Sequence, residues 1–290
     1  MSSPVKPGWP DVSETPFSLL LPVYAGDKAA YFAKAFTSTV IEQSRRPSDV
    51  VIVQDGPIGA ELAAAVATAT AESPVPVNHV RLPANVGLAR ALETGLQHCA
   101  HDVVARMDAD DISLPTRFER QLTVIDDGYD LVGTGMLEFD EDGRVLGQRI
   151  PPTDPDEIAS TARFHDPFNH PTVVYRRSVV ARAGGYRELP LMEDYWLFAR
   201  MIQAGALVAN LPDPLVMYRV DAGAYGRRGG WTLFRSEIAL QRSLLRDAFV
   251  TRRQFARNIL VRGGYRFVPV AVRRIAYRRF IVRDYGNTGD

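Results

Sequence analysis

The sequence predicts an α/β protein with a mainly parallel sheet flanked by helices, followed by a basic helical extension. Short apolar runs alternate with helical patterns over the first 130 residues, which is typical of a parallel sheet covered on both faces. Beyond Gly229 the pattern is helical and rich in arginine. The chain has 290 residues, 46% of them hydrophobic, which is enough for one large domain and a smaller appendage.

The first predicted element is a strand over Ser18–Val23. Asp27 is placed to cap the helix that follows, in which Phe32, Phe36 and Val40 recur at helical spacing. Strands and helices then alternate, with strands at 50–53, 77–82 and 102–107 and helices at 59–71, 87–98 and 115–126. The last of these helices starts with a proline, whose fixed φ suits a first turn.

After about residue 130 the pattern changes to a hairpin. Two apolar runs over 131–139 and 144–150 flank Asp140-Glu141-Asp142-Gly143, a turn signal. The remaining predicted elements are strands at 172–175 and 215–219, a helix at 193–203, and helix beyond Gly229 that is interrupted at Gly263-Gly264 and Pro269.

Several classes of protein are disfavoured by composition. The single cysteine, Cys99, excludes an internal disulfide and fits a reducing compartment. Residues 1–16 contain four prolines and no apolar core, unlike a signal peptide. No run of about 18 apolar residues occurs that could span a bilayer. We therefore expect a cytoplasmic protein.

Acidic residues follow the predicted strands at the edge where open parallel sheets bind ligands. Tyr24 and Asp55 follow two strands, and Asp108-Ala109-Asp110-Asp111 follows a third. Three carboxylates in four residues repel one another unless a cation is bound, and oxygen ligands suit Mg²⁺ or Mn²⁺ together with substrate phosphates. The residues alone leave two other interpretations open: Asp55 as a turn residue, and the cluster as a solvated turn before the helix at Pro115.

Five short segments occur in a recognisable order. They are Leu20-Leu21-Pro22-Val23-Tyr24, Val51-Ile52-Val53-Gln54-Asp55-Gly56, Asn85-Val86-Gly87-Leu88-Ala89-Arg90-Ala91, Arg106-Met107-Asp108-Ala109-Asp110-Asp111 with Leu114-Pro115 and Arg117-Phe118, and Met192-Glu193-Asp194-Tyr195-Trp196-Leu197. This series resembles family-2 glycosyltransferases with the GT-A fold, over roughly residues 17–220. The resemblance implies transfer of a sugar, with inversion, from a nucleoside-diphosphate sugar donor to an acceptor hydroxyl, with Mn²⁺ or Mg²⁺ as cofactor.

The resemblance also implies roles for individual residues. Asp194 is the expected general base, since direct displacement needs a base opposite the leaving group. Its place at a helix start would otherwise indicate stabilisation of the helix N-terminus. The other expected roles are donor binding by Pro22, Val23, Tyr24, Asp55, Asn85, Arg90 and Asp108, metal binding by Asp110 and Asp108, and an acceptor region at His170 and Glu193.

Two positions depart from the family pattern, and the role of a third residue, His170, is open. Gln54 stands where the family usually has an acid, so the nucleotide contact would rest on Asp55. Val220 and Asp221 follow Tyr218-Arg219 where a histidine is often found, so no late histidine ligand is expected. His170 in Asn169-His170-Pro171-Thr172 is open to a structural interpretation, because a lone histidine is more often structural.

We expect a catalytic domain over 17–225, with a nucleotide-sugar half at 17–130 and an acceptor half at 131–225, and a helical basic extension over 226–290. From Arg242 onward there are 12 arginines and 3 acidic residues, a net charge of +9, whereas the rest of the chain carries −9. Aromatic and aliphatic residues are interleaved with these arginines. The extension is therefore expected to lie on an anionic membrane surface, on its inner face, or to pack on the acidic domain.

The expected partners are the donor and an acceptor glycan or lipid-linked glycan, in surface polysaccharide or glycolipid assembly. Nucleic acid is not expected, because no nucleic-acid module is present. One alternative is a nucleotidyltransferase, but the loop Tyr24-Ala25-Gly26-Asp27-Lys28 is poor in glycine for that activity. Another is a non-catalytic membrane-associated protein on a transferase scaffold, which the complete set Asp108, Asp110 and Asp194 disfavours.

Overall fold

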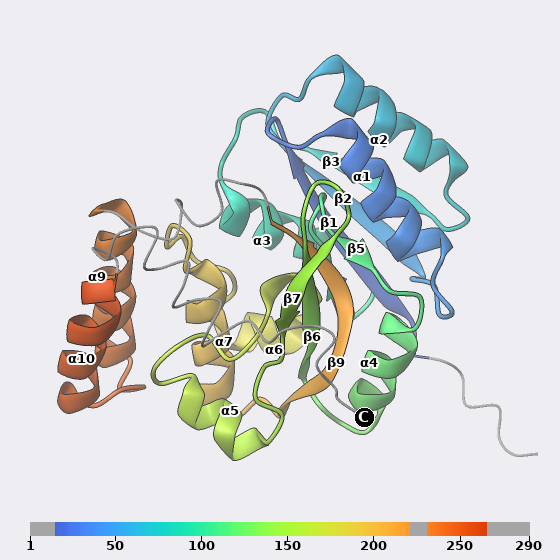
Figure 1. The fold of residues 1–290 in the computed structure, drawn as a ribbon. Coiled ribbons are helices and arrows are strands. Elements are labelled where there is room, and N and C mark those ends of the chain that lie inside the picture. Colours follow the sequence, from blue (N-terminus) through green and yellow to red (C-terminus); the bar gives the residue numbers. More distant parts are fainter. Residues whose placement is uncertain (1–14, 221–230, 266–290) are drawn as a thin grey trace, which may run out of the picture.

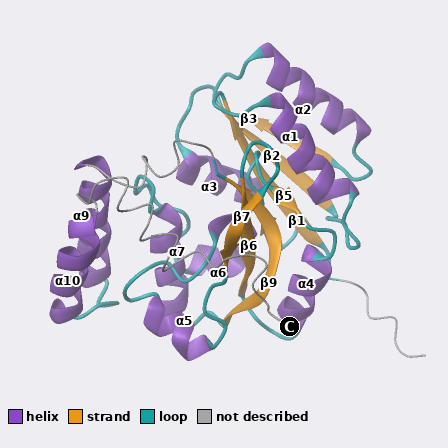
Figure 2. Ribbon diagram, in the orientation of Figure 1, coloured by secondary structure: helices purple, strands orange, loops and turns teal. Residues whose placement is uncertain are grey.

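The structure is a computed structural model that describes residues 15–220 and 231–265. The expected interruption at Pro269 and the last part of the extension lie outside the described residues. Figure 1 shows a curved central sheet with helices on both faces, and a pair of helices, α9 and α10, at one side. The α/β prediction is confirmed, and Figure 2 gives the distribution of helix and strand.

Over the described ranges, the sheet has nine strands in the order β3-β2-β1-β4-β8-β6-β9-β5, with β7 paired to β6. Strands β1, β2, β3 and β4 form a parallel half, whereas β8, β6, β9, β5 and β7 form a mixed half. The bounds are β1 Phe17–Tyr24, β2 Asp49–Asp55, β3 Val77–Arg81, β4 Val103–Arg106, β5 Ile112–Ser113, β6 Leu131–Phe139, β7 Val145–Arg149, β8 Val174–Arg176 and β9 Val208–Arg219.

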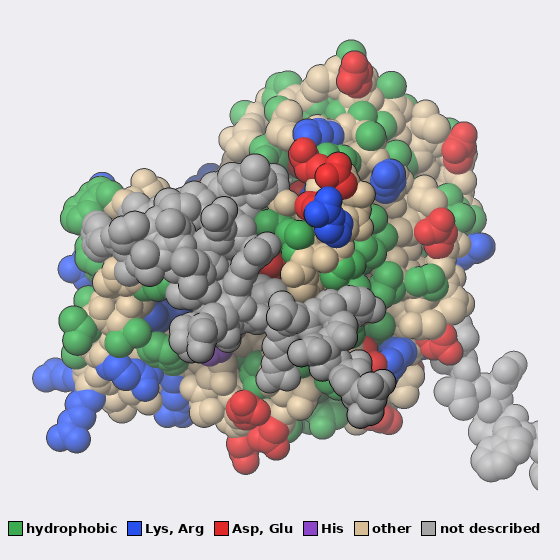
Figure 3. Space-filling view, in the orientation of Figure 1, with side chains coloured by type: hydrophobic (Ala, Val, Ile, Leu, Met, Phe, Trp, Pro, Cys, Tyr) green, Lys and Arg blue, Asp and Glu red, His purple; other side chains and the backbone are tan. Residues whose placement is uncertain are grey.

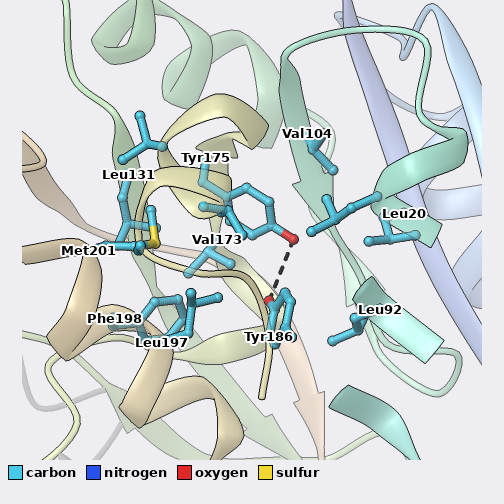
Figure 4. Packing of buried hydrophobic residues seen from close by; sticks show 14 of the residues in the cluster. Leu20, Leu92, Val104, Leu131, Val173, Tyr175, Tyr186, Leu197, Phe198 and Met201 are labelled. Atoms are coloured by element: carbon cyan, nitrogen blue, oxygen red, sulfur yellow. Dashed lines mark hydrogen bonds between the residues drawn. The ribbon is translucent and has the colours of Figure 1, made fainter. Parts of the chain in front are cut away.

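Consecutive side chains of β1 enter different cores, because side chains alternate across a strand. Leu20 packs against α3 (Leu88–His98), α6 (Arg177–Arg182) and α7 (Glu193–Gln203), a core seen in Figure 4. Leu19 and Leu21 pack on the opposite face against α1 (Ala29–Phe36), α2 (Ala60–Glu72) and α4 (Arg117–Asp126). The continuous apolar run of β1 is therefore required for a strand buried on both faces.

Four details of the predicted elements were wrong. Helix α4 begins at Arg117, two residues after the proline expected at its start, and the helical backbone continues through Gly263-Gly264, where an interruption was expected. Strand β9 begins at Val208 rather than at 215, and it passes through Pro212 and Pro214, which break the strand pattern in sequence. The paired strand β6 shifts register on both sides of Gly135, opposite Pro214, and this irregularity accommodates the prolines. Asp27 does not cap α1, because Lys28 is the N-cap residue.

Some short elements were not predicted. Helix α5 (Pro155–Thr161) has Asp154 as its N-cap, with the carboxylate accepting a hydrogen bond from the Glu157 amide. Helix α6 follows β8 directly, and the chain before β8 forms a 3-10 turn, η2 (His170–Thr172). A π-helical turn, η1 (Thr37–Ile41), extends α1.

The described part of the extension is helical and packs on the α/β domain. It consists of α9 (Trp231–Arg246), α10 (Arg252–Asn258) and a π-helical turn, η3 (Ile259–Gly263). Leu240 and Leu244 of α9 share an apolar cluster with Trp196 and Ala199 of α7. Within the described ranges, no helix has the length and apolar character needed to cross a membrane.

Candidate active site

The carboxyl ends of β1 and β2 bring together the first group of expected donor-binding residues. Tyr24 and Asp55 are register partners. Tyr24 is half-exposed, whereas Val23 packs in the core and Pro22 is buried. Of this stretch of β1, Tyr24 is therefore the residue that offers its side chain to a ligand.

Asp55 fixes the loop that precedes α3. Its carboxylate accepts hydrogen bonds from the amides of Val86, at 2.7 Å, and Gly87, at 3.0 Å, while the Asn85 amide group donates to the Asp55 carbonyl at 3.3 Å. Gly56 allows this close approach, since a Cβ there would lie 2.5 Å from the Asn85 nitrogen. The structure thus joins Asp55 and Asn85, and contact of either with the donor nucleotide stays a prediction.

The acidic segment after β4 forms a compact cluster. One carboxylate oxygen each from Asp108, Asp110 and Asp111 lies within 4.8 Å of the others. Burial and the neighbouring Asp108 raise the pKa of Asp110 to about 6. Burial raises the pKa of Asp111 well above its usual value, and the negative charge of Asp110 raises it further. Such crowding of carboxylates is unfavourable without a cation.

Asp111 offers an unused oxygen to such a cation. Its Oδ1 accepts a hydrogen bond from the Arg219 amide at 2.9 Å. Its buried Oδ2 accepts none from the described residues. A buried oxygen without a donor is costly, so the donor set of this cluster fits a hard divalent cation.

Asp27 is a further acid at this site that sequence reasoning assigned to a helix cap. Its carboxylate accepts a hydrogen bond from the Tyr24 amide at 2.9 Å. Burial raises the pKa of Asp27 to about 7, to which the charges of Asp110 and Asp108 contribute. The strand and helix pattern gave no signal for this placement, because it depends on how the loop after β1 folds back.

A second group of residues lies around Asp194, in the first turn of α7. The Tyr195 amide donates to Asp194 Oδ1 at 2.8 Å, and Nδ1 of His170 lies 3.5 Å from Asp194 Oδ2. Burial raises the pKa of Asp194 above its usual value, and the hydrogen bond from Tyr195 opposes this shift. Burial and the charge of Asp194 raise the pKa of the neighbouring Glu193 to about 7. The structure therefore groups the expected base with both residues of the expected acceptor region.

His170 is held by buried tyrosines. Its Nε2 lies 3.1 Å from the Tyr186 hydroxyl, which lies 3.5 Å from the Tyr175 hydroxyl, the contact drawn in Figure 4. Burial lowers the pKa of His170 well below its usual value. The imidazole is therefore neutral at physiological pH, with one nitrogen facing Asp194 and the other facing a hydroxyl.

Arg106, the last residue of β4, joins the two groups. Its guanidinium pairs with both oxygens of Asp108, with Nη1 donating to Oδ2 at 2.8 Å. The same charge stabilises the ionised form of Asp194 and disfavours protonation of His170. Arg106 is 1% exposed. Sequence reasoning gave it no role, because a charged residue at the end of a strand carries no signal of burial.

Arg117 of α4 stabilises this arrangement by hydrogen bonds to two backbone carbonyls. Its guanidinium is fully buried and donates to the carbonyls of Arg106, at 2.6 Å, and Pro171, at 3.2 Å. Burial and the charge of Arg106 lower the pKa of Arg117 to about 9. The segment of the acidic cluster and the segment of His170 thus share one donor.

Two more residues flank this centre. Arg90, expected near the donor phosphates, is exposed and pairs with Glu188, with Nε 2.8 Å from Oε1. Asp166 was not singled out by sequence. Burial raises its pKa well above the usual value, and the negative charge of Asp194 adds to this. Asp166 thus belongs to the surroundings of Asp194.

The arrangement combines two chemical capabilities around the buried guanidinium of Arg106. The three carboxylates, one of which pairs with Arg106, can hold a divalent cation and the phosphates it binds. Asp194, whose ionised form the charge of Arg106 stabilises, can accept a proton from a group placed against it. Groups that bind phosphates and a base beside them are what transfer from a phosphate-bearing donor to a hydroxyl requires.

Comparisons with known proteins agree with this chemistry. The model of glycosyl transferase family 2 matches residues 18–184. The amylovoran biosynthesis glycosyltransferase AmsE of Erwinia amylovora is 37% identical over 268 residues, covering 91% of this chain and 98% of that protein. An Escherichia coli UDP-Gal:alpha-D-GlcNAc-diphosphoundecaprenol beta-1,3-galactosyltransferase is 30% identical over 275 residues, covering 93% and 98%.

Solved structures share the fold at low identity. S. aureus TarS 1–349 in complex with UDP superposes with a TM-score of 0.63 at 16% identity, covering 92% of this chain and 75% of that one. The mannosyltransferase PcManGT from Pyrobaculum calidifontis, in complex with GDP-Man and Mn²⁺, gives 0.61 at 19% identity, covering 95% and 79%. The expected GT-A architecture is thereby confirmed, and the nucleotidyltransferase alternative is set aside. The chain belongs to glycosyl transferase family 2, and it transfers a sugar from a nucleotide-sugar donor.

Proposed function

We propose that this glycosyltransferase is metal-dependent and inverting, with Asp194 as the general base that deprotonates the acceptor hydroxyl. The observation that carries the proposal is that one buried guanidinium, that of Arg106, pairs with Asp108 of the acidic cluster and also stabilises the ionised form of Asp194. An in-line displacement needs a base on the side opposite the leaving diphosphate. A base and a diphosphate site in one centre support that geometry.

Asp110 and Asp108 are the proposed ligands of Mn²⁺ or Mg²⁺, and the buried, donor-free Oδ2 of Asp111 supports a cation in this cluster. When bound, such an ion neutralises the charge that develops on the departing diphosphate. Arg106 holds the carboxylate of Asp108 by two contacts, which keeps it oriented toward the donor.

Asp194 takes the acceptor proton, and His170 positions it. In the tautomer that carries its hydrogen on Nδ1, the neutral imidazole points a donor at Asp194 Oδ2, while Nε2 accepts from the Tyr186 hydroxyl. The Tyr195 amide fixes the other oxygen. With both oxygens oriented, the lone pair left on Asp194 faces the acceptor, and Glu193 lies beside it to bind the acceptor.

The donor is a nucleoside-diphosphate sugar bound at the carboxyl ends of β1 and β2. We assign contacts with the nucleotide to Tyr24, Asp55, Asn85 and Arg90 and to the backbone of Pro22 and Val23, whose side chains are buried, and a ribose or metal contact to Asp108. Proteins of the same fold have been solved in complex with UDP, UDP-GlcNAc or GDP-Man, which supports a donor site here and leaves the base of the nucleotide to experiment.

The acceptor is proposed to be a lipid-linked glycan in surface polysaccharide assembly. The names of two relatives support this, one by amylovoran biosynthesis and one by a diphosphoundecaprenol-linked acceptor. We retain the division into a catalytic domain over 17–225 and a basic extension over 226–290 as part of the proposal.

The extension would bring the enzyme to the inner face of the membrane. Trp231, Leu260 and Val261 are exposed at 62%, 77% and 51%, and Lys and Arg side chains gather over α10, at the lower left of Figure 3. Exposed apolar and basic groups on one surface favour binding to anionic lipid. The apolar contact of α9 with α7 is compatible with this role.

A thermal-shift screen of nucleoside diphosphates with and without Mn²⁺, on wild type and Asp110→Ala, tests the donor site. We expect a rise in Tm with one nucleotide that requires both the metal and Asp110. Asp194→Asn should keep this shift and lose sugar transfer. The absence of any shift at high nucleotide concentration would refute the donor site, and unchanged transfer by Asp194→Asn would refute the assigned base.

A further inference from the structure

A groove lies beside the α/β domain, between α5 and α10. Its volume is about 590 Å³, and the described residues that line it include Asp156, Arg163, Phe164, His165 and Arg257. None of these residues belongs to the acidic cluster or to the group around Asp194. The groove is therefore separate from the proposed donor site.

Two arginines give the groove its charge. No carboxylate among the described residues pairs with the guanidinium of Arg163 or Arg257, whereas Arg262, which follows α10, is paired with Glu237 at 2.6 Å. Asp156 is the one acid among the described residues that line the groove. Two arginines without acidic partners in one concave surface favour an anionic ligand, and the planar guanidinium suits phosphate oxygens.

Arg257 is held in place before any ligand binds. Its guanidinium lies 4.5 Å from the centre of the Phe164 ring, and its Nε and Nη2 donate to Asn258 Oδ1 at 3.1 and 3.0 Å. Asn258 in turn donates to the Arg163 carbonyl at 2.8 Å. A cation fixed in this way loses little conformational entropy when it binds an anion.

The wall of the groove leads toward the base. The Tyr195 hydroxyl donates to the Ala162 carbonyl at 2.8 Å, which ties this wall to the first turn of α7. His165 lines the groove, and burial and the charge of Asp194 together raise the pKa of the next residue, Asp166. The short segment from Ala162 to Asp166 therefore connects the arginines of the groove with the surroundings of Asp194, the proposed base.

We infer that the Arg163–Arg257 groove binds the diphosphate of an isoprenoid-linked acceptor and so directs the acceptor sugar to Asp194. This inference rests on the proposed function, to which it adds a site for the acceptor's carrier. The exposed Leu260 and Val261, in η3 immediately after α10, lie on the same segment of the extension and suit the isoprenoid chain.

Farnesyl diphosphate, below its micelle concentration, is a suitable probe in isothermal titration calorimetry. The test variant is Arg163→Gln/Arg257→Gln. The matched control is Arg252→Gln/Arg253→Gln, which removes the same charge from exposed positions of α10 that do not line the groove. We expect wild type and control to bind alike, and the test variant to bind at least tenfold more weakly.

Folding of the variants is checked by the metal-dependent thermal shift with the donor nucleotide, which neither change should alter. Arg163→Gln alone provides a second variant, since its guanidinium makes no hydrogen bond with a described residue. The same proteins are also sedimented with phosphatidylglycerol vesicles, because a lipid headgroup carries the same phosphate chemistry.

Equal weakening in test and control variants, or no binding by wild type, would overturn the inference. So would loss of vesicle binding by the groove variant with unchanged farnesyl diphosphate binding, because the groove would then recognise headgroups. If the donor nucleotide gives no shift in wild type, the proposed function fails instead, and that result is read independently of the groove.

Discussion

Nδ1 of His170 lies 3.5 Å from Oδ2 of Asp194, although one residue belongs to a 3-10 turn before β8 and the other to the first turn of α7. The contact places a neutral donor against the proposed base. It makes His170 a positioning residue, whose removal should affect the proton transfer more than the binding of either substrate.

Replacing His170 with Phe should lower kcat by roughly tenfold to hundredfold, within the range of general base catalysis, with little change in the KM of the donor. His170→Asn, which can place its amide group near the position of Nδ1, should recover part of the loss. The acid limb of the pH profile should move to higher pH in His170→Phe, because Asp194 loses a donor to its charged form. Equal loss in both variants with an unmoved limb would indicate a purely structural role.

The pH dependence of transfer should report Asp194. A general base works in its ionised form, so activity is lost as the pH falls through its pKa, which burial raises above the usual value for aspartate. Glu193 lies beside it and carries a pKa of about 7. Glu193 is therefore still protonated while Asp194 ionises, and Glu193→Gln should leave the acid limb of kcat in place. A limb that moves with this substitution would show that Glu193 sets it instead of Asp194.

Asp27 should make the metal-free protein less stable as the pH rises. Its folded pKa of about 7 lies above its usual 3.8. The stabilisation of the folded state is therefore complete below about pH 4 and is lost as the pH rises through 7. In EDTA, Tm should fall between pH 5 and 8.5. Asp27→Asn should reduce the loss in the free energy of unfolding over this pH range by on the order of 1–2 kcal/mol. An unchanged slope would contradict the raised pKa.

Arg117 should be among the residues most sensitive to substitution outside the reacting centre. Arg117→Lys cannot reach both the Arg106 and Pro171 carbonyls and leaves a buried group unpaired, at a cost of roughly 2–5 kcal/mol. Chemical denaturation measures the loss. Arg120→Gln on the same helix breaks an exposed ion pair with Asp213 and should cost below about 1 kcal/mol. Similar values for the two variants would rule out the special place of Arg117.

The predictable part of this fold is the part with continuous local signals. The four parallel strands were placed within two residues because each is an apolar run between turn residues. The start of β9 was missed because Pro212 and Pro214 disfavour a strand locally, whereas the irregular pairing opposite Gly135 accommodates them.

The features of the site also divide into those that the sequence shows and those that only the tertiary structure shows. The spacing of Asp108, Asp110 and Asp111 and the acidic start of α7 are visible in sequence. The pairing of His170 with Asp194, the fold-back of Asp27 and the burial of Arg106 are not, because each depends on elements that meet only in the tertiary structure. Periodicity describes one element at a time.

The apolar contact between α7 and α9 bears on how such enzymes diversify. The family match ends at residue 184, before α7, and Trp196 of α7 packs in the same cluster as Leu240 and Leu244 of α9. The helix that carries Asp194 thus has one side in the core of the α/β domain and the other against the extension. In a chimera that takes its extension from a relative, α7 would have to come from the same relative as α9, because the two helices pack on each other.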